Sequence, residues 1–295
     1  MSTVADPGLE AFDESRPRLF GIAYRMLGSV AEAEDVVQDA WLRWQQTDRS
    51  VVENPAGFLT TVTTRLAINV ADSARRRREV YVGPWLPEPV DTSADPALGA
   101  ENGEALEAAV LVLLERLPAR ERAAYVLREA FDYPYPRVAE ILEISEANTR
   151  QVVARARQHV AEHRSAPVDR AEHRRLLEAF VSAARGGDLG DLERLLAAGV
   201  VSTSDGAGVT RNAARVPIVG RSKVARVLAA FRDRFWTGST ITWLETNGRP
   251  SLLVRHGDEP AAVLAIEAGP DGIEQLLWVM APDKLSQIGR LPGQH

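Results

Sequence analysis

The chain has 295 residues, a net charge of −6 and no cysteine. At roughly 150 residues per domain, this length predicts about two domains, or three if they are small. The absence of cysteine excludes disulfides, Cys-ligated zinc, iron–sulfur clusters and thiol chemistry. No apolar run is long enough to span a membrane, and the N-terminus lacks the pattern of a signal peptide. We therefore expect a cytoplasmic protein with no membrane partner.

The negative charge is unevenly distributed along the chain. Residues 170–295 contain 16 Lys/Arg and 14 Asp/Glu, a net of +2, whereas residues 1–169 contain 19 and 27, a net of −8. The acidic part nevertheless contains the densest basic run, four arginines at 75–78. Segregated charge of this kind indicates separate surfaces for separate partners.

Residues 9–80 have the apolar periodicity of three helices. Gly28 ends the first helix, and Ser29 caps the second, which has an acidic outer face. Asn54 caps the third helix, which runs into the arginines at 75–78.

The arginine run has two interpretations. It could be a solvated helix end, because the helix dipole favours cations at a C-terminus. Four consecutive arginines exceed what a cap needs, however, and Asn69, Asp72 and Ser73 share a helix face next to them. This combination favours a nucleic-acid surface.

Residues 81–104 form a linker, because four prolines exclude a regular helix there. Every charged residue from Asp91 to Glu104 is acidic. The segment 85–89, with the sequence Trp-Leu-Pro-Glu-Pro, is apolar. A linker without a docking site has little reason to expose Trp and Leu, so we expect this segment to be docked.

Residues 105–165 are helical again and end in a recognisable pattern. A short helix begins at Pro136, a tight turn follows at 143–144, and Ser145 caps a longer helix that ends near residue 163. Two helices joined by a tight turn, the second with a basic outer face, are typical of a helix-turn-helix. The alternative is an ordinary helical hairpin with a solvated basic face.

The helix-turn-helix interpretation assigns DNA contacts to the second helix. Arg and Gln pair bidentately with guanine and adenine. The residues expected at base edges are Arg150, Gln151 and Ala154. Phosphate contacts are expected from Arg155, Arg157 and Arg164.

His159 and His163, one helical turn apart, are a candidate metal pair. No third ligand follows at a suitable spacing, so a polar helix tail is the favoured interpretation. The chain also lacks a phosphate-binding glycine loop, an HExxH motif and a serine nucleophile elbow. We therefore expect no metal and no cofactor.

Residues 170–295 predict an α+β domain with helices first and an antiparallel sheet later. Helices are expected at about 170–185, 188–198 and 220–235. Strands are expected near 239–246, 250–256, 261–268 and 272–280, separated by good turn signals.

Several of these segments resemble parts of bacterial sigma factors of the extracytoplasmic-function type. Residues 16–78 resemble region 2, most clearly at 18–25, 33–39 and 54–59 and in Asn69 with Asp72. Residues 106–160 resemble region 4, most clearly at 117–122 and 144–157. Three short motifs are similar to those of the SigJ-like subgroup, which carries a C-terminal SnoaL-like domain: WLPEP at 85–89, DGAG at 205–208 and APDKL at 281–285.

The resemblance implies a multidomain fold. Two all-α sigma domains would occupy 1–80 (region 2, a helical bundle) and 105–165 (region 4, a helix-turn-helix), joined by the linker 81–104. A cone-shaped SnoaL-like α+β domain would follow at 170–295.

The resemblance also implies partners and roles. Such a protein is not an enzyme but binds core RNA polymerase and promoter DNA to initiate transcription. Region 4 reads the minus-thirty-five element, while region 2 docks on the polymerase and opens the minus-ten element. The residues implied in polymerase binding are Glu34, Asp35, Gln38 and Asp39, and those implied in reading single-stranded DNA are Asn69, Asp72, Arg75 and Arg76.

The SnoaL-like domain is expected to contact region 2 and the linker, and thereby to control activity in cis. The residues implied in this regulation are Trp85, Leu86, Pro87, Glu88, Pro89, Asp205, Gly206, Gly208, Pro282, Asp283 and Lys284.

Alternative functions stay open. The third domain could be a small-molecule sensor, which makes a small-molecule ligand a candidate partner. It could also be a SnoaL-type enzyme with Asp205 as acid or base near Trp236, Trp243 and Trp278. A plain helix-turn-helix repressor would bind duplex DNA without polymerase.

Overall fold

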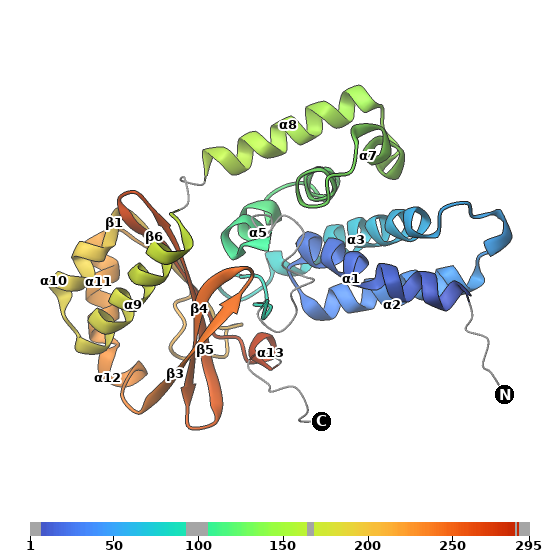
Figure 1. Cartoon of the computed structure of the whole chain (residues 1–295). Helices are drawn as coiled ribbons and strands as arrows, with labels where there is room; N and C mark the ends of the chain where they lie inside the picture. The colour runs from blue at the N-terminus through green and yellow to red at the C-terminus, as the bar shows by residue number, and fades with distance from the viewer. Residues whose placement is uncertain (1–6, 93–105, 164–167, 287, 289–295) are drawn as a thin grey trace. The chain divides into compact units, whose positions relative to one another are not determined.

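The computed structural model describes residues 7–92, 106–163, 168–286 and 288, in two compact units (Figure 1). The first unit comprises residues 1–79, 95–106 and 110–162, and the second comprises 80–94, 107–109 and 163–295. The division separates most of the linker from the helices on either side of it. None of the described helices combines the length and the apolar character that crossing a membrane requires.

The first unit begins with three long helices. They are α1 (Pro7–Leu27), α2 (Val30–Gln46) and α3 (Pro55–Glu79), with a 3-10 turn η1 (Arg49–Val51) before α3. Gly28 has a φ of 64°, which ends α1, and the Ser29 hydroxyl accepts a hydrogen bond from the Glu32 amide at 3.4 Å. At the start of α3, the side-chain oxygen of Asn54 accepts a hydrogen bond from the Gly57 amide at 2.9 Å, so the local signals at 28–32 and 54–55 are both confirmed.

The second half of this unit consists of shorter helices. They are α5 (Ala108–Glu115), α6 (Ala119–Tyr125), the π-helical η3 (Val126–Ala130), α7 (Tyr135–Leu142) and α8 (Glu146–Glu162). Residues 119–130 are helical throughout, but the chain widens into a π-turn at Val126. Helices α7 and α8 form the expected helix-turn-helix, and Glu143 between them has a left-handed φ of 55°.

A buried arginine ties the two halves of the first unit together. Arg122 on α6 is 3% exposed, and its guanidinium donates to the carbonyl of Met26 and to Glu115 at 2.8 Å. Arg78 at the end of α3 also pairs with Glu115. On α7, Arg137 donates to the hydroxyl of Thr61 on α3 at 2.9 Å. The helices of the two halves therefore pack directly against one another.

The second unit is a six-stranded mixed sheet covered by helices (Figure 1). The strand order is β2-β1-β6-β5-β4-β3. The strands are β1 (Leu196–Asp205), β2 (Ile218–Val219), β3 (Ser239–Thr246), β4 (Arg249–His256), β5 (Glu259–Gly269) and β6 (Gly272–Val279). The helices are α9 (Arg170–Gly186), α10 (Leu189–Leu195), α11 (Arg221–Ala230), α12 (Arg232–Phe235) and α13 (Pro282–Leu285).

The α+β architecture is confirmed, with two differences from the expected sheet. Strand β1 begins inside the predicted helix 188–198 and pairs in parallel with β6, so the sheet is mixed rather than antiparallel. The predicted helix 220–235 is divided at Phe231 into α11 and α12. The apolar core between sheet and helices includes Phe180, Leu252 and Trp278.

One core residue makes the stability of this unit depend on pH. His173 on α9 is 3% exposed, and its Nε2 donates to the carbonyl of Ile266 at 3.0 Å. Its Nδ1 is buried without a hydrogen-bond partner among the described residues. Burial lowers the pKa of His173, and the nearby Arg249 and Arg170 lower it further. The neutral ring is therefore the form that the fold accommodates.

We expect the free energy of unfolding to fall as the pH drops below about 6.5, because protonation puts an unpaired N–H in the core. A lowered folded-state pKa gives stability that is present above the unfolded-state pKa and lost at lower pH. His173→Gln should flatten this dependence, whereas His163→Gln, at an exposed position, should retain it. Urea unfolding followed by tryptophan fluorescence at pH 7.5 and 5.0 measures the free energy of unfolding. If both variants lose the same amount of it between these pH values, His173 is not the group responsible.

Candidate functional site

Helix α8 presents the predicted DNA-contacting residues on one exposed face. Its opposite face is buried against α6 and α7 through Val153 and Ala156. The exposed positions are Arg150, Gln151, Ala154, Arg155 and Arg157. The helical spacing expected from the sequence is thus present, and Arg164 lies outside the described residues.

Three of these arginines pair with acidic side chains on the surface. Arg150 pairs with Glu146 one turn earlier and lies over the ring of Tyr135, 4.4 Å from its centroid. Arg155 and Arg157 pair with Glu121 and Glu129 at 2.9 and 2.7 Å, respectively. Exposed ion pairs contribute little to stability, so phosphates and bases can replace them at low cost.

The arginines at the end of α3 differ in their surroundings: some are exposed, and one is turned inward. Asn69, Asp72 and Arg75 are exposed, as a surface for single-stranded DNA requires. Arg77 pairs with Glu32, and Arg78 is turned inward, where it donates to the carbonyl of Leu27 at 2.6 Å. Arg78 is thus structural, while the side chain of Arg76 lies outside the described residues.

The outer face of α2 carries the predicted polymerase contacts: Asp35, Gln38 and Asp39 are exposed, and Glu34 pairs with Arg16 at 2.6 Å.

A buried carboxylate binds the linker to the C-terminal domain. Asp205 ends β1 and is 0% exposed. Its two oxygens accept hydrogen bonds from the hydroxyl of Tyr81 at 2.6 Å and from the amide of Leu86 at 2.9 Å. The ammonium group of Lys284 on α13 completes the site at 2.7 Å. We call these four residues the linker clamp.

Lys284 connects all three motifs of the clamp. Besides Asp205, it donates to the carbonyl of Leu86, and its ammonium lies 4.2 Å from the centroid of the Trp85 ring. The desolvation of this buried ion pair is offset by hydrogen bonds to both partners. Burial raises the pKa of Tyr81, and its hydrogen bond to Asp205 raises it further, so the hydroxyl stays a donor.

The glycine motif after Asp205 allows the linker to approach closely. Gly208 has a φ of 73°, and a Cβ atom there would lie 2.8 Å from the Cβ of Val82 in the linker. At Gly206, a Cβ atom would lie 2.4 Å from the Cβ of Ala213. Both glycines are therefore required by the packing of the turn and not by its φ angles alone.

A second contact holds the linker further along, at the turn between β3 and β4. The amide of Asn247 donates to the carbonyl of Val90 at 2.9 Å, and the Gly248 amide donates to the hydroxyl of Thr92 at 3.0 Å. Beyond the undescribed residues 93–105, the buried Glu107 pairs with Arg249 at 2.8 Å. We call these contacts the linker anchor. Thr92 and Glu107, which flank residues 93–106, are thus bound at the same turn.

The structure brings together most of the predicted regulatory residues and adds others. Leu86, Pro87, Glu88 and Pro89 are buried and Trp85 is half-buried, as expected for a docked segment. Pro282 and Asp283 are exposed and make no contact with the carboxylate of Asp205 that the structure describes. Tyr81, Glu107, Asn247 and Arg249 also take part, although the sequence did not predict them. Asn247 was identifiable only as a turn residue, and nothing in the sequence pairs Glu107 with Arg249.

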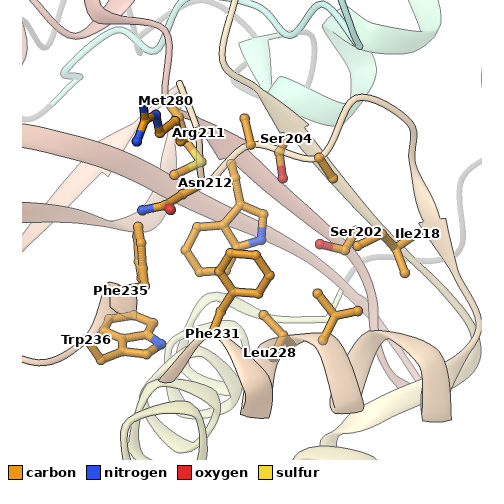
Figure 2. Close-up of a pocket in the computed structure, with 14 residues that line it drawn as sticks. Ser202, Ser204, Arg211, Asn212, Ile218, Leu228, Phe231, Phe235, Trp236 and Met280 are labelled. Carbon is orange, nitrogen blue, oxygen red and sulfur yellow. The ribbon is translucent and has the colours of Figure 1, made fainter. Parts of the chain in front are cut away.

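The C-terminal domain contains a cavity of about 180 Å³ between the sheet and α11 (Figure 2). Trp236 and Trp278 line it, whereas Trp243 lies elsewhere, 4.8 Å from the guanidinium of Arg174. Asp205 does not line it, and neither a carboxylate nor a histidine is among the described lining residues. The suggestion that Asp205 acts as acid or base beside three tryptophans is therefore wrong, because its carboxylate is occupied by the linker.

Comparisons with known proteins match both helical parts. A family model described as Sigma-70 region 2 matches residues 11–78, and one described as Sigma-70, region 4 matches residues 107–160. The ECF RNA polymerase sigma factor SigJ of Mycobacterium tuberculosis is 40% identical over 233 residues, which are 77% of this chain and 74% of that protein.

The similarity extends into the C-terminal domain. The probable ECF RNA polymerase sigma factor SigI of the same organism is 30% identical over 289 residues, or 96% of each chain. The crystal structure of M. tuberculosis SigJ has a TM-score of 0.76 and 33% identity, covering 94% of this chain and 98% of that one.

The clamp predicts that Asp205→Asn frees the linker. The variant keeps the side-chain shape but removes the charge, and breaking a buried ion pair costs about 3–5 kcal/mol. We expect chymotrypsin to cleave after Tyr81 and Trp85 at least tenfold faster than in the unaltered chain. Mass spectrometry of the fragments measures this.

The matched control is Asp271→Asn, at an exposed aspartate in the turn between β5 and β6. Its cleavage pattern should equal that of the unaltered chain. Slow cleavage in both variants would show that Asp205 does not hold the linker.

Proposed function

The chain belongs to the extracytoplasmic-function family of RNA polymerase sigma factors, which direct promoter recognition and transcription initiation, and we propose that its C-terminal domain inhibits this activity by holding the linker. One observation carries the proposal: the linker is bound at both ends by one domain. The clamp and Asn247 hold residues 81–92, and Arg249 holds Glu107.

Promoter geometry explains why linker length matters. The minus-ten and minus-thirty-five elements are about 25 base pairs apart, on the order of 85 Å along a duplex. Regions 2 and 4 must therefore separate far beyond the direct packing of α3 on α6 and α7. The 28 residues from 80 to 107 can reach at most about 95 Å when fully extended, at about 3.4 Å per residue.

The linker anchor shortens the distance that the linker can span between regions 2 and 4. Thr92 and Glu107 are both bound at the turn between β3 and β4, so the 14 residues between them add no separation between the two regions. The clamp fixes the preceding segment along the same domain. A chain with both contacts intact is thus too short to serve both promoter elements, and releasing the linker restores the reach.

Contacts inside the first unit also hold regions 2 and 4 together. Arg122 joins α6 to the end of α1, and Arg137 joins α7 to α3. Binding to polymerase must exchange these contacts for contacts with the core enzyme. We propose that the acidic face of α2 is the polymerase-binding surface, that Asn69, Asp72, Arg75 and Arg76 read single-stranded DNA, that α8 reads the duplex, and that the protein acts in the cytoplasm.

Gly208→Ala should increase transcription. The added methyl group overlaps Val82 and expels the linker, while Asp205 and Lys284 stay in place. The control is Gly238→Ala, because Gly238 has a φ of 72° but nothing within 4 Å of the added Cβ, so only the backbone strain is shared. Run-off transcription with core polymerase should give several-fold more transcript for Gly208→Ala than for Gly238→Ala.

A truncation after residue 165 is the second arm of this experiment. It removes the domain that holds the linker and should also exceed the full chain in transcript yield. Equal or lower yields from both the truncation and Gly208→Ala would overturn inhibition through the linker.

Substitution of two glutamines on α8 tests whether this helix reads the promoter duplex. Gln151→Ala should lose about 1–3 kcal/mol of discrimination at one base of the minus-thirty-five element. Gln158→Ala, also exposed on α8 but hydrogen-bonded to Glu162 near its end, should change little. Competition binding of the holoenzyme to promoters substituted base by base measures the difference, and equal specificity profiles would contradict the assignment.

A further inference from the structure

Three arginines of the C-terminal domain lie together at its surface. Arg211, Arg215 and Arg234 have no acidic partner within the described part of the chain. They surround a hollow of about 400 Å³ whose described lining contains no carboxylate. Val82 and Gly83 of the linker form part of its wall. We call this hollow the basic mouth.

The basic mouth adjoins the cavity of 180 Å³, because the two share four lining residues: Ser204, Arg211, Ala213 and Ala214. Four aromatic side chains line the inner cavity, together with aliphatic ones. The rings of Phe235 and Trp278 meet edge to face with centroids 5.5 Å apart, and Trp236 lies 6.3 Å from Trp278. A cavity of about 150 Å³ with apolar walls is large enough for benzene, so this one has room for a single substituted ring.

Polar groups are few in the inner cavity. Figure 2 shows the side chains of Ser202, Ser204 and Asn212 turned towards the same hollow as the rings of Phe231 and Phe235. The Oδ1 atom of Asn212 is buried and accepts no hydrogen bond from the described residues. A buried unpaired acceptor is costly, so a ligand that donates a hydrogen bond there would be favoured.

We propose that the C-terminal domain binds a small aromatic acid. Its ring occupies the inner cavity, a hydroxyl group on the ring donates to Asn212, and its carboxylate lies among the three arginines. Guanidinium groups suit a carboxylate because they form two parallel hydrogen bonds with it. A mouth lined with positive charge also concentrates anions.

The ligand would act on the linker, and this step rests on the proposed function. Val82 and Gly83 line the mouth only while the linker is held, so the bound acid and the held linker stabilise one another. The ligand is therefore a corepressor: it slows chymotryptic cleavage of the linker and lowers transcription.

Binding is tested on the full chain by isothermal titration calorimetry with benzoate and its uncharged isostere benzamide. Benzoate should bind saturably and more tightly than benzamide. Arg234→Gln should weaken benzoate roughly tenfold without affecting benzamide. The control Arg226→Gln changes an exposed arginine of α11 that does not line the mouth, and it should leave both affinities unchanged.

The location of the ring is tested by a pair of neighbouring residues on β2. Ile218 lines the cavity, whereas Val219 is exposed and does not. Ile218→Trp should abolish benzoate binding and Val219→Trp should preserve it. Equal affinities in these two variants, or no benzoate binding to the unaltered chain, would overturn the proposal.

The role of Asn212 is tested with the three hydroxybenzoate isomers. At least one of them should bind three- to tenfold more tightly than benzoate, and Asn212→Leu should remove that advantage. If no isomer gains affinity, the hydrogen bond to Asn212 is wrong.

A last measurement separates the ligand from the linker mechanism. If benzoate binds but leaves linker cleavage and transcription unchanged, the corepressor role is overturned. The linker mechanism is then judged separately by Gly208→Ala, which needs no ligand. If Gly208→Ala leaves transcription unchanged while benzoate binds, the proposed function fails and the binding site stands.

Discussion

A buried carboxylate must be fully compensated, and in this chain the compensation comes from two distant segments, the linker and α13. Asp205 is the last residue of β1, Lys284 lies on α13, and Tyr81 and Leu86 belong to the linker. Removing the linker would leave the ion pair with water in place of a hydroxyl and an amide. The electrostatics of this buried ion pair therefore favours the docked linker.

The same chemistry makes the contact reversible. Replacing a buried ion pair with apolar side chains often stabilises a protein, so a charged clamp is not the strongest way to hold a segment. Its advantage is that water and other donors can replace the linker when it leaves. The docked Leu86 adds roughly 1.5–3 kcal/mol of apolar burial. A polymerase surface that binds regions 2 and 4 separately has to exceed only these contacts and the packing of α3 on α6 and α7.

The local structure of the chain was predictable from the sequence wherever a side chain acts on its own backbone. Ser29 and Ser145 cap their helices as expected, and the helix-turn-helix has its exposed basic face. Strand β1 was missed because the two residues after α10, Leu196 and Ala197, continue its apolar pattern. Its pairing with β6 depends on residues more than seventy positions away, which no local pattern contains.

The clamp was predictable only in part, for the same reason. Resemblance to a family singled out Asp205, Lys284 and Trp85, and the structure gives each a partner from another motif. Tyr81, Asn247 and Arg249 have no distinctive local pattern, since their roles arise from pairing with segments at least 120 residues away. The motif at 281–285 was also predicted only in part, because Lys284 binds Asp205 whereas Asp283 faces solvent.

The wall between the cavity and the clamp is a single strand, and this places both under one constraint. Ser204 lines the cavity, and the next residue, Asp205, holds the linker. The amide of Met280, another lining residue, donates to the carbonyl of Asp205 at 2.7 Å. Because successive side chains on a strand point to opposite faces, Ser204 faces the cavity while Asp205 faces the linker. One peptide unit thus joins the lining of the cavity to the clamp.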